Sequence, residues 1–131
     1  MRTILTDRPY AAKALELVEL GLPWVNADAL ARALDVNLEK LASLLDIPPA
    51  TFYRRKRARR FSKHETDRLM RFALLWWLAC DDFENEDDAR EWLKSPQFGL
   101  NGAIPLEYAI TEVGAREVEN LLHRIEYGVL A

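Results

Sequence analysis

Apolar residues recur along most of the chain at intervals of three and four residues, which is the period of an amphipathic α-helix. The clearest examples are residues 38–45 and 118–125, where Leu, Ala, Val and Ile occupy positions i, i+3, i+4 and i+7. Alternation with a period of two, which is typical of a strand, is not sustained, and Val and Ile are sparse. The pattern therefore predicts an all-α protein.

Helix start and stop signals divide this pattern into separate helices. Asn37 and Asn85 are suitable N-caps, Pro49 suits the first position of a helix, and Ser62 with Glu65 forms a capping-box pattern. We expect Gly114 to separate the last two helices. The predicted helices span about residues 11–21, 26–34, 38–45, 49–57, 62–80, 86–94, 105–110 and 115–127.

The long helix predicted at residues 62–80 changes character along its length. Its first half is polar and basic, whereas residues 72–80 are apolar on every side and need cover from more than one surface. At nine residues this apolar run is too short to span a bilayer. We expect it to be the central post of the molecule, packed by both ends of the chain.

The terminus and the cysteine content indicate a compartment. The first ten residues lack the apolar core and the small-residue cleavage site of a signal peptide. Cys80 is the only cysteine, so the chain cannot form an internal disulfide. These features predict a cytoplasmic protein with no membrane partner.

Positive charge is concentrated in the middle of an acidic chain. Residues 54–80 carry nine Lys and Arg against two acidic residues, whereas residues 81–131 carry four basic residues against twelve acidic ones. The whole chain has a net charge of −3 and a pI near 5.4. This division suggests two surfaces with two different partners.

Residues 37–57 have the pattern of a helix-turn-helix, with Ile47 buried in the turn and Phe52 as the core anchor of the second helix. The opposite side of that helix would face the DNA major groove. There, Arg54 can contact a guanine edge through two hydrogen bonds, worth roughly 1–3 kcal/mol of discrimination. Most of the other cations suit phosphates. The predicted DNA-contacting residues are Pro49, Ala50, Thr51, Tyr53, Arg54, Arg55, Arg57, Arg59, Arg60 and Lys63.

Three questions about this basic segment stay open at the level of sequence. Lys56 stands where a helix-turn-helix often has leucine, which favours a short recognition helix followed by a basic wing or turn at residues 56–60. The alternative to DNA binding is a solvated, solubilising face. A helix-turn-helix protein usually reads two half-sites, so we expect a homodimer, through either residues 11–21 or residues 72–80.

Motifs for catalysis or for holding a cofactor are not found in the sequence. There is no P-loop, GxGxxG, nucleophile elbow or HExxH. The two histidines and the cysteine are scattered, and the acidic residues 81–88 lack the glycine and the ligand spacing of an EF-hand loop. We therefore expect neither an enzyme, nor a metal site, nor a cofactor.

Residues 89–131 resemble the toxin-binding domain of the Xre/MbcA/ParS antitoxins. The matching pattern is a Trp-Leu helix, a proline, a Leu-x-Gly turn, Pro-Leu, a glycine followed by Val-x-x-Leu-Leu, and Arg-Ile-x-x-Gly near the end. Residues 54–71 also look like the segment that joins the helix-turn-helix to this domain in longer members of the family. The resemblance covers about residues 28–131.

This resemblance implies a type II antitoxin. Its cognate toxin would be a RES-domain protein that consumes NAD, held inactive by direct contact, and its helix-turn-helix would bind operator DNA to repress its own operon. The implied organisation is an N-terminal helical region at 1–61, a connecting helix at 62–83 and a toxin-binding domain at 84–131. The alternatives are a stand-alone transcription regulator whose C-terminal domain binds a ligand or dimerises, and an adaptor that binds RNA or acidic protein.

In this family the C-terminal end lies beside the active-site cleft of the toxin. Tyr127 is the strongest contact expected here, because a tyrosine at a helix end reaches outward with a polar tip. Leu100 and Ile125 could instead be core residues, and Gly102 and Gly128 could serve only turns. The predicted toxin-contacting residues are Leu100, Asn101, Gly102, Arg124, Tyr127, Gly128, Val129 and Leu130.

Overall fold

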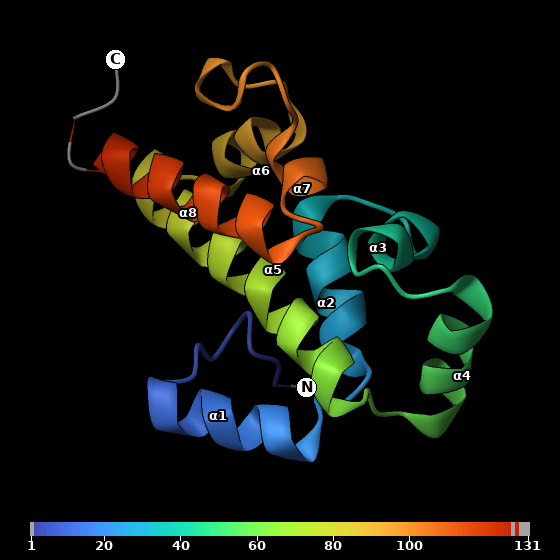
Figure 1. Cartoon of the computed structure of the whole chain (residues 1–131). Helices are drawn as coiled ribbons and strands as arrows, with labels where there is room; N and C mark the ends of the chain where they lie inside the picture. Colours follow the sequence, from blue (N-terminus) through green and yellow to red (C-terminus); the bar gives the residue numbers. More distant parts are fainter. Residues whose placement is uncertain (1, 127, 129–131) are drawn as a thin grey trace. The chain divides into compact units, whose positions relative to one another are not determined.

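The computed structural model of the chain describes residues 2–126 and 128. Within them the chain forms eight α-helices, one short 3-10 helix and no strand, which confirms the all-α class (Figure 1). Two compact units, Met1–Ala73 and Leu74–Ala131, divide the chain inside its longest helix. The elements are α1 (Ala11–Leu20), α2 (Val25–Leu34), α3 (Leu38–Leu44), α4 (Pro49–Ala58), α5 (Lys63–Phe83), α6 (Glu86–Lys94), η1 (Phe98–Leu100), α7 (Pro105–Tyr108) and α8 (Glu112–Glu126).

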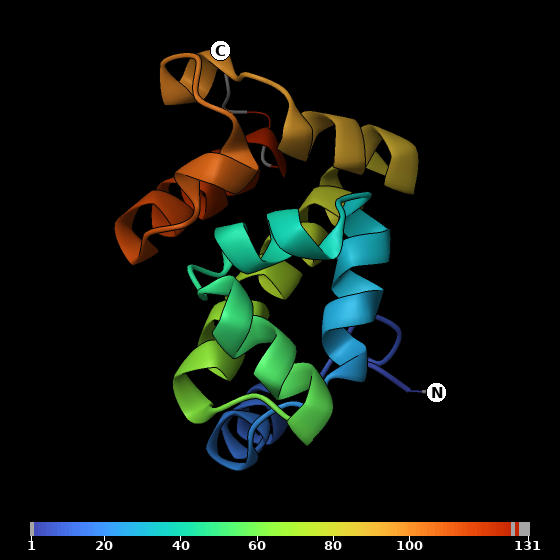
Figure 2. The ribbon, with the colours of Figure 1, turned by 90° about the vertical axis from the view of Figure 1, so that its right-hand side faces the viewer.

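Helices α3 and α4 of the first unit form the helix-turn-helix, and α2 packs against α3 (Figure 2). Asn37 caps α3 by accepting a hydrogen bond from the Lys40 amide at 2.7 Å. In the turn, Asp46 adopts a left-handed backbone with φ of 54°, and the Ile47 amide donates to the Ala42 carbonyl at 3.0 Å. The turn closes on a buried Ile47, as predicted, and α4 follows directly.

An aromatic cluster holds α4 in place. Phe52 of α4 is fully buried, and its ring centroid lies 4.7 Å from that of Trp24. Trp24 also stacks on Phe61, with centroids 5.2 Å apart. Burial of side chains of this size contributes roughly 1.5–3 kcal/mol each. The prediction that Phe52 anchors the second helix is therefore confirmed.

Hydrogen bonds join two connecting segments of the first unit. The Trp24 amide donates to the Arg59 carbonyl, and the Phe61 amide donates to the Leu22 carbonyl, both at 2.9 Å. The Leu22 amide donates to the hydroxyl of the fully buried Thr66 of α5 at 2.8 Å. Because the segment after α4 is fixed on the segment between α1 and α2, α4 is held at its C-terminal end as well as through Phe52.

The second unit is built from the later part of α5 together with α6, η1, α7 and α8. Asn85 caps α6 as predicted, because its side chain accepts a hydrogen bond from the Asp88 amide at 2.8 Å. Helix α7 packs against both α6 and α8, and η1 packs against α8. The predicted apolar stripe of α8 is buried at Val118, Leu121 and Leu122.

The last helix begins at Glu112, earlier than predicted, and Gly114 lies inside its first turn rather than at its boundary. Thr111 accounts for the start, because its hydroxyl accepts a hydrogen bond from the Gly114 amide at 3.0 Å. A Cβ atom at Gly114 would overlap the carbonyl oxygen of Tyr108. Glycine is needed here for close packing and does not stop the helix.

Helices α4 and α5 are both longer than predicted. The expectation of a short recognition helix with a wing at residues 56–60 was wrong, because α4 continues to Ala58 and only Arg59, with φ of 67°, leaves it. Lys, Arg and Ala are good helix formers, and no stop signal precedes Arg59. Helix α5 ends at Phe83 rather than near Cys80.

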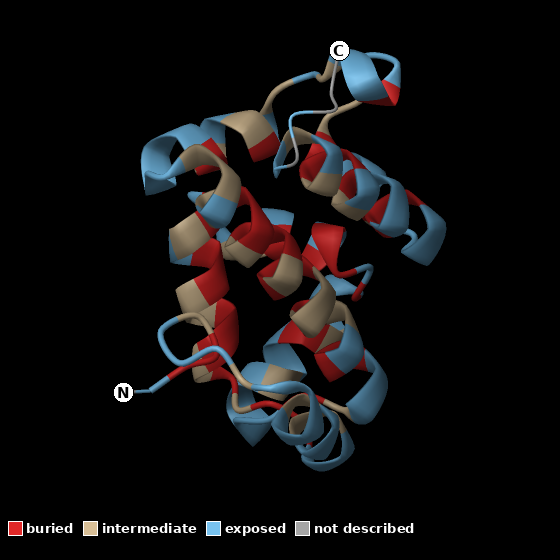
Figure 3. Cartoon of the chain, turned by 90° about the vertical axis from the view of Figure 1, so that its left-hand side faces the viewer, coloured by how far each residue is buried: buried red, intermediate tan, exposed pale blue. Residues whose placement is uncertain are grey.

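Helix α1 lies on the surface although its sequence is apolar. None of its residues is buried (Figure 3). The side chains of Leu15 and Leu20 are 70% and 62% exposed. Leu22, which the sequence pattern places on the same stripe as Leu15, follows the end of the helix at Gly21 and is buried. In contrast, residues 72–80 are largely buried, as the pattern predicted.

Candidate functional site

Helix α4 presents a polar and basic face to solvent. Pro49, Ala50, Tyr53, Arg54 and Arg57 follow the spacing i, i+1, i+4, i+5, i+8, which places them on one side of the helix, and all five are exposed. The first four are the residues predicted to point outward, so their exposure is confirmed. Arg57 joins this face, where sequence reasoning had assigned it to phosphates.

Arg54 lies in the middle of this face, and its guanidinium is supported from within the helix. Its Nη2 donates a hydrogen bond to the hydroxyl of the half-buried Thr51 at 3.2 Å. The contact uses one of the five guanidinium N–H donors and leaves the others for an outside acceptor. Thr51 is therefore placed to orient Arg54.

Arg55, predicted to contact phosphate, forms an ion pair inside the first unit. Its Nε donates to Oε1 of Glu65 at 2.7 Å, and Glu65 is only 7% exposed. The same Glu65 oxygen accepts the Ser62 amide at 2.8 Å, and the Ser62 hydroxyl accepts the Glu65 amide at 3.3 Å. The predicted capping box is thus confirmed, and the structure adds a tie from it to α4.

Charge and hydrogen bonding explain the protonation state of Glu65. Burial by itself raises the pKa of this carboxyl group, but hydrogen bonds from Arg55 and Ser62 outweigh burial and lower its pKa below the ordinary value. Glu65 is therefore held as a carboxylate, and Arg55 is its counter-ion.

Two more of the predicted phosphate contacts have partners within the first unit. Nη1 of Arg60 donates to the carbonyl oxygen of Gly21, which helps to fix the segment after α4. Nζ of Lys63 lies 3.0 Å from Glu19 of α1, and both side chains are largely exposed. Such an exposed pair is worth about 0–1 kcal/mol and can exchange for a phosphate. The Arg60 contact is structural.

Three more cations near the C-terminal end of α4 are exposed. Lys56, Arg57 and Arg59 have no ion pair with any residue that the structure describes. Arg59 is the residue with a left-handed backbone that ends α4. These three cations, with Arg54, make up the basic surface of the first unit.

In the second unit, the predicted toxin-contacting residues differ in exposure. Leu100 is only 6% exposed and is a core residue, so its assignment as a contact does not hold. Asn101 and Gly102 are exposed and have positive φ values of 55° and 86°. Arg124 of α8 and Gly128 are exposed too. Tyr127, Val129 and Leu130 lie outside the described residues.

Sequence reasoning missed the most exposed large apolar side chain that the structure describes. Phe98, in η1, is 93% exposed and lies in the same loop as Asn101 and Gly102. The signal in the sequence was an apolar residue in a short segment between Pro96 and Gly99, where no helical period places it in a core.

Acidic groups crowd the end of α5. Burial raises the pKa of Asp82, and the charges of Glu126 and Asp81 raise it further. His123 of α8 lies between Glu119 and Glu126, with ring nitrogens 3.6 and 3.7 Å from their carboxyl oxygens. Acidic side chains therefore outnumber basic ones at this end of α5, and His123 is a nearby group that lowers the pKa of Asp82.

Cys80 does not have the environment of a reactive thiol. Burial, followed by the charges of Glu86 and Asp81, raises its pKa to about 11. Among the described residues, no group of three or more His, Cys, Asp or Glu side chains is placed to hold a metal ion. None of the described helices has the length and hydropathy needed to cross a membrane.

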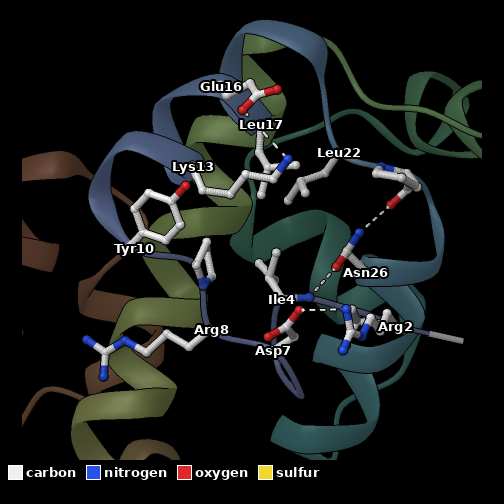
Figure 4. Close-up of a pocket in the computed structure, with 13 residues that line it drawn as sticks. Arg2, Ile4, Asp7, Arg8, Tyr10, Lys13, Glu16, Leu17, Leu22 and Asn26 are labelled. Atoms are coloured by element: carbon white, nitrogen blue, oxygen red, sulfur yellow. Dashed lines mark hydrogen bonds and ion pairs between the residues drawn. The ribbon is translucent and has the colours of Figure 1, made fainter.

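A cavity of about 510 Å³ lies in the first unit between the N-terminal segment, α1 and the start of α2 (Figure 4). Four of its charged residues form two ion pairs, Arg2 with Asp7 and Lys13 with Glu16, each at 3.6 Å. The Asn26 side chain accepts a backbone amide of the N-terminal segment at 2.9 Å. The contact of Asn26 fastens the N-terminal segment to the start of α2.

Comparison with known proteins assigns both units. Residues 13–74 match the antitoxin Xre-like helix-turn-helix domain, and residues 81–128 match the antitoxin Xre/MbcA/ParS C-terminal toxin-binding domain. The chain belongs to the Xre-type antitoxins. The first match contains the basic surface around α4, and the second contains the loop with Phe98 and helix α8.

Two curated relatives carry the same family name. Antitoxin Xre of Photorhabdus laumondii subsp. laumondii is 37% identical over 73 residues, which are 55% of this chain and 49% of the relative. Antitoxin Xre of Yersinia enterocolitica serotype O:8 is 35% identical over 79 residues, 60% of this chain and 53% of the relative. The chain therefore spans about half the length of the curated relatives it matches.

Proposed function

We propose that this Xre-type antitoxin belongs to a type II toxin–antitoxin system, inhibits a RES-domain, NAD-consuming toxin by direct contact, and binds operator DNA to repress its own operon. The observation that carries the proposal is that the chain combines two matched domains of opposite charge. The helix-turn-helix has an exposed basic face on α4, and the toxin-binding domain is acidic. A protein that acts on its own operon would work in the cytoplasm.

For DNA, the geometry supports two different roles for the exposed cations, base recognition and phosphate contact. Arg54 and Arg57 share the exposed face of α4 and read base edges in the major groove, whereas Lys56 and Arg59 contact phosphates. Arg54→Ala should weaken operator binding by about 1–3 kcal/mol and relax its specificity. Arg59→Ala should weaken operator and random DNA alike and reduce the salt slope by about one unit.

Arg55 gives a matched control for this division. It stands beside Arg54 in sequence, but it is paired with Glu65 and is not on the exposed face. Arg55→Ala should therefore leave the salt slope of DNA binding unchanged and lower the stability of the chain. Equal effects of Arg54→Ala and Arg55→Ala on the operator-to-random ratio would contradict the assignment.

For the toxin, the proposed contacts are Asn101, Gly102, Arg124 and the C-terminal residues from 127 onward. Deletion of residues 128–131 should preserve folding and DNA binding and abolish neutralisation. Growth rescue by the truncated chain would exclude the C-terminal end from the interface. The full-length variant Lys94→Ala, an exposed change at the end of α6, is the control and should still rescue growth.

A homodimer is part of the proposal, because two helix-turn-helix copies are needed to read two half-sites. Of the two surfaces that the sequence left open, α1 is favoured. Its Leu15 and Leu20 are largely exposed, whereas most of residues 72–80 are buried within the chain. Leu15→Glu should give a monomer in analytical ultracentrifugation and weaken operator binding without loss of helicity.

The deciding experiment is co-expression with the protein encoded by the adjacent reading frame. Growth arrest and loss of cellular NAD, both reversed only when this chain is present, would support the proposal. If a RES-type neighbour is absent, or its arrest is not reversed, the second candidate stands: a stand-alone helix-turn-helix regulator. The matched helix-turn-helix domain favours that second candidate over any function without DNA.

A further inference from the structure

The loop at residues 97–103 holds an aromatic side chain in solvent. Phe98 is 93% exposed, more than any other large apolar side chain that the structure describes. Isolated exposed apolar residues are ordinary on protein surfaces. The feature that distinguishes Phe98 is the rigidity of the backbone that carries it.

Backbone hydrogen bonds close this loop on itself. The Gln97 amide donates to the Ala103 carbonyl at 3.0 Å, and the Gln97 carbonyl accepts the amides of Leu100 and Gly102 at 3.0 and 2.9 Å. The Asn101 amide donates to the Phe98 carbonyl at 3.0 Å. None of these bonds uses the phenyl ring, so the loop geometry does not depend on the side chain at position 98.

The base of the loop is fixed to its own unit on two sides. The Gln97 side chain donates to the carbonyls of Trp92 and Ser95 at 2.9 and 3.2 Å, which ties the loop to the end of α6. On the other side, a Cβ atom at Gly99 would lie 2.8 Å from the side chain of Leu121 of α8. The loop is therefore anchored at Gln97 and Gly99, on either side of Phe98.

We propose that Phe98, displayed by this rigid loop, is the apolar anchor with which the chain binds its toxin, and that it fills an apolar pocket with a basic rim on the toxin surface. The inference rests on the proposed function. Aromatic side chains are enriched among the residues that dominate binding energy. A pre-ordered loop reduces the entropy lost when the ring becomes immobilised.

The charge and the domain match select the toxin over a second copy of this chain. The loop lies within residues 81–128, which match the toxin-binding domain. Residues 81–131 carry four basic and twelve acidic side chains, so two copies of this region repel each other, whereas a basic partner surface is attracted. A protruding side chain also needs a cavity in its partner, and a self-paired surface would have to supply both.

The test measures the dissociation constant of the full-length chain for the adjacent-frame RES-domain protein by calorimetry. Phe98→Ala should weaken binding by roughly thirtyfold or more. Phe98→Tyr, which keeps the ring, should stay within about fivefold of the wild type. Val113→Ala is the matched control: Val113 is 76% exposed in the same unit but outside the loop, and its loss should change binding less than threefold.

The thermal midpoint and operator affinity of Phe98→Ala should equal those of the wild type, because the ring makes no contribution to the loop backbone. Toxin binding by Phe98→Ala within threefold of the wild type would overturn the inference and leave the proposed function standing. A dimer-to-monomer change in Phe98→Ala with unchanged toxin affinity would also overturn it, in favour of self-association. Failure of the wild type to bind the toxin removes both proposals.

Discussion

Replacement of Glu65 by Gln tests whether the charge of Glu65 holds the recognition helix α4 to the start of α5. One carboxylate oxygen accepts both the Ser62 amide at 2.8 Å and Nε of Arg55 at 2.7 Å. Gln keeps an acceptor oxygen and nearly the same shape, so the substitution removes the charge and little else. The Arg55 partner is then left with a neutral amide.

The magnitude follows from the exposure of the two groups. A hydrogen bond to a charged group contributes about 1.5–3 kcal/mol, against about 0.5–1.5 kcal/mol for a neutral one. The Glu65 side chain is 9% exposed, but that of Arg55 is 31% exposed, so solvent screens part of the Coulomb attraction. We expect Glu65→Gln to lower the free energy of unfolding by about 1–2 kcal/mol at pH 7.

The effect should depend on pH with a defined sign. The pKa of Glu65 is lower in the folded chain than its ordinary value of 4.5. The ionised carboxylate therefore stabilises the fold above pH 4.5, and this stabilisation is lost as the pH falls through the folded-state pKa. The difference between wild type and Glu65→Gln should be full at pH 7 and should shrink below pH 4.5.

Urea unfolding followed by circular dichroism, at pH 7 and at steps down to pH 4, measures this difference. Arg55→Ala combined with Glu65→Gln completes a double-mutant cycle, with an expected coupling of about 1 kcal/mol. Arg57→Ala, an exposed cation on the same helix, is the control and should lie within about 0.5 kcal/mol of the wild type. A coupling near zero, or a difference that is the same at every pH, would refute the reasoning.

Three further perturbations have expected outcomes. Gly114→Ala should lower the free energy of unfolding, measured in urea, by about 2–4 kcal/mol, because the new Cβ overlaps the Tyr108 carbonyl. This loss exceeds the helix preference of Ala over Gly, which is about 1 kcal/mol. A stabilised variant would contradict this contact. Cys80, whose pKa burial and nearby acids raise to about 11, should react with a thiol reagent at pH 8 about a hundredfold more slowly in the folded chain than in urea; equal rates would argue against its burial. Burial and neighbouring acids raise the pKa of Asp82, so its charge destabilises the fold at neutral pH. Asp82→Asn should therefore raise the unfolding free energy by about 0.5 kcal/mol at pH 7 and have no effect below pH 3.8. A loss of stability at pH 7 would contradict this assignment.

Helix starts were predictable because capping is local. Asn37, Ser62 with Glu65, and Asn85 each bind a backbone amide three residues away, so the residues that define the start lie together in the sequence. Gly114 shows the limit of this reasoning. Its role depends on the Tyr108 carbonyl and the Thr111 hydroxyl, and a glycine in sequence looks the same whether it stops a helix or permits close packing.

The exposed face of α4 was predictable for the same kind of reason. Once Ile47 and Phe52 are placed inside, the period of 3.6 places Pro49, Ala50 and Arg54 outside. The sequence did not predict that Arg55 and Arg60, unlike the exposed cations, have partners within the chain. Their partners, Glu65 and the Gly21 carbonyl, lie ten and 39 residues away and meet them only through the packing of α4, α5 and the connecting segments.

Three features could be predicted from the sequence: the all-α class, the helix-turn-helix, and the division of charge between the basic middle and the acidic end. These follow from periodicity, caps and composition, which act over a few residues. The exposure of individual apolar side chains and the pairing of individual charges depend on the tertiary structure. It left Leu15 of α1 and Phe98 in solvent, buried Leu100, and paired Arg55 with Glu65. Hydrophobic burial and ion pairing depend on which distant segment arrives beside a side chain, and a local pattern does not contain that information.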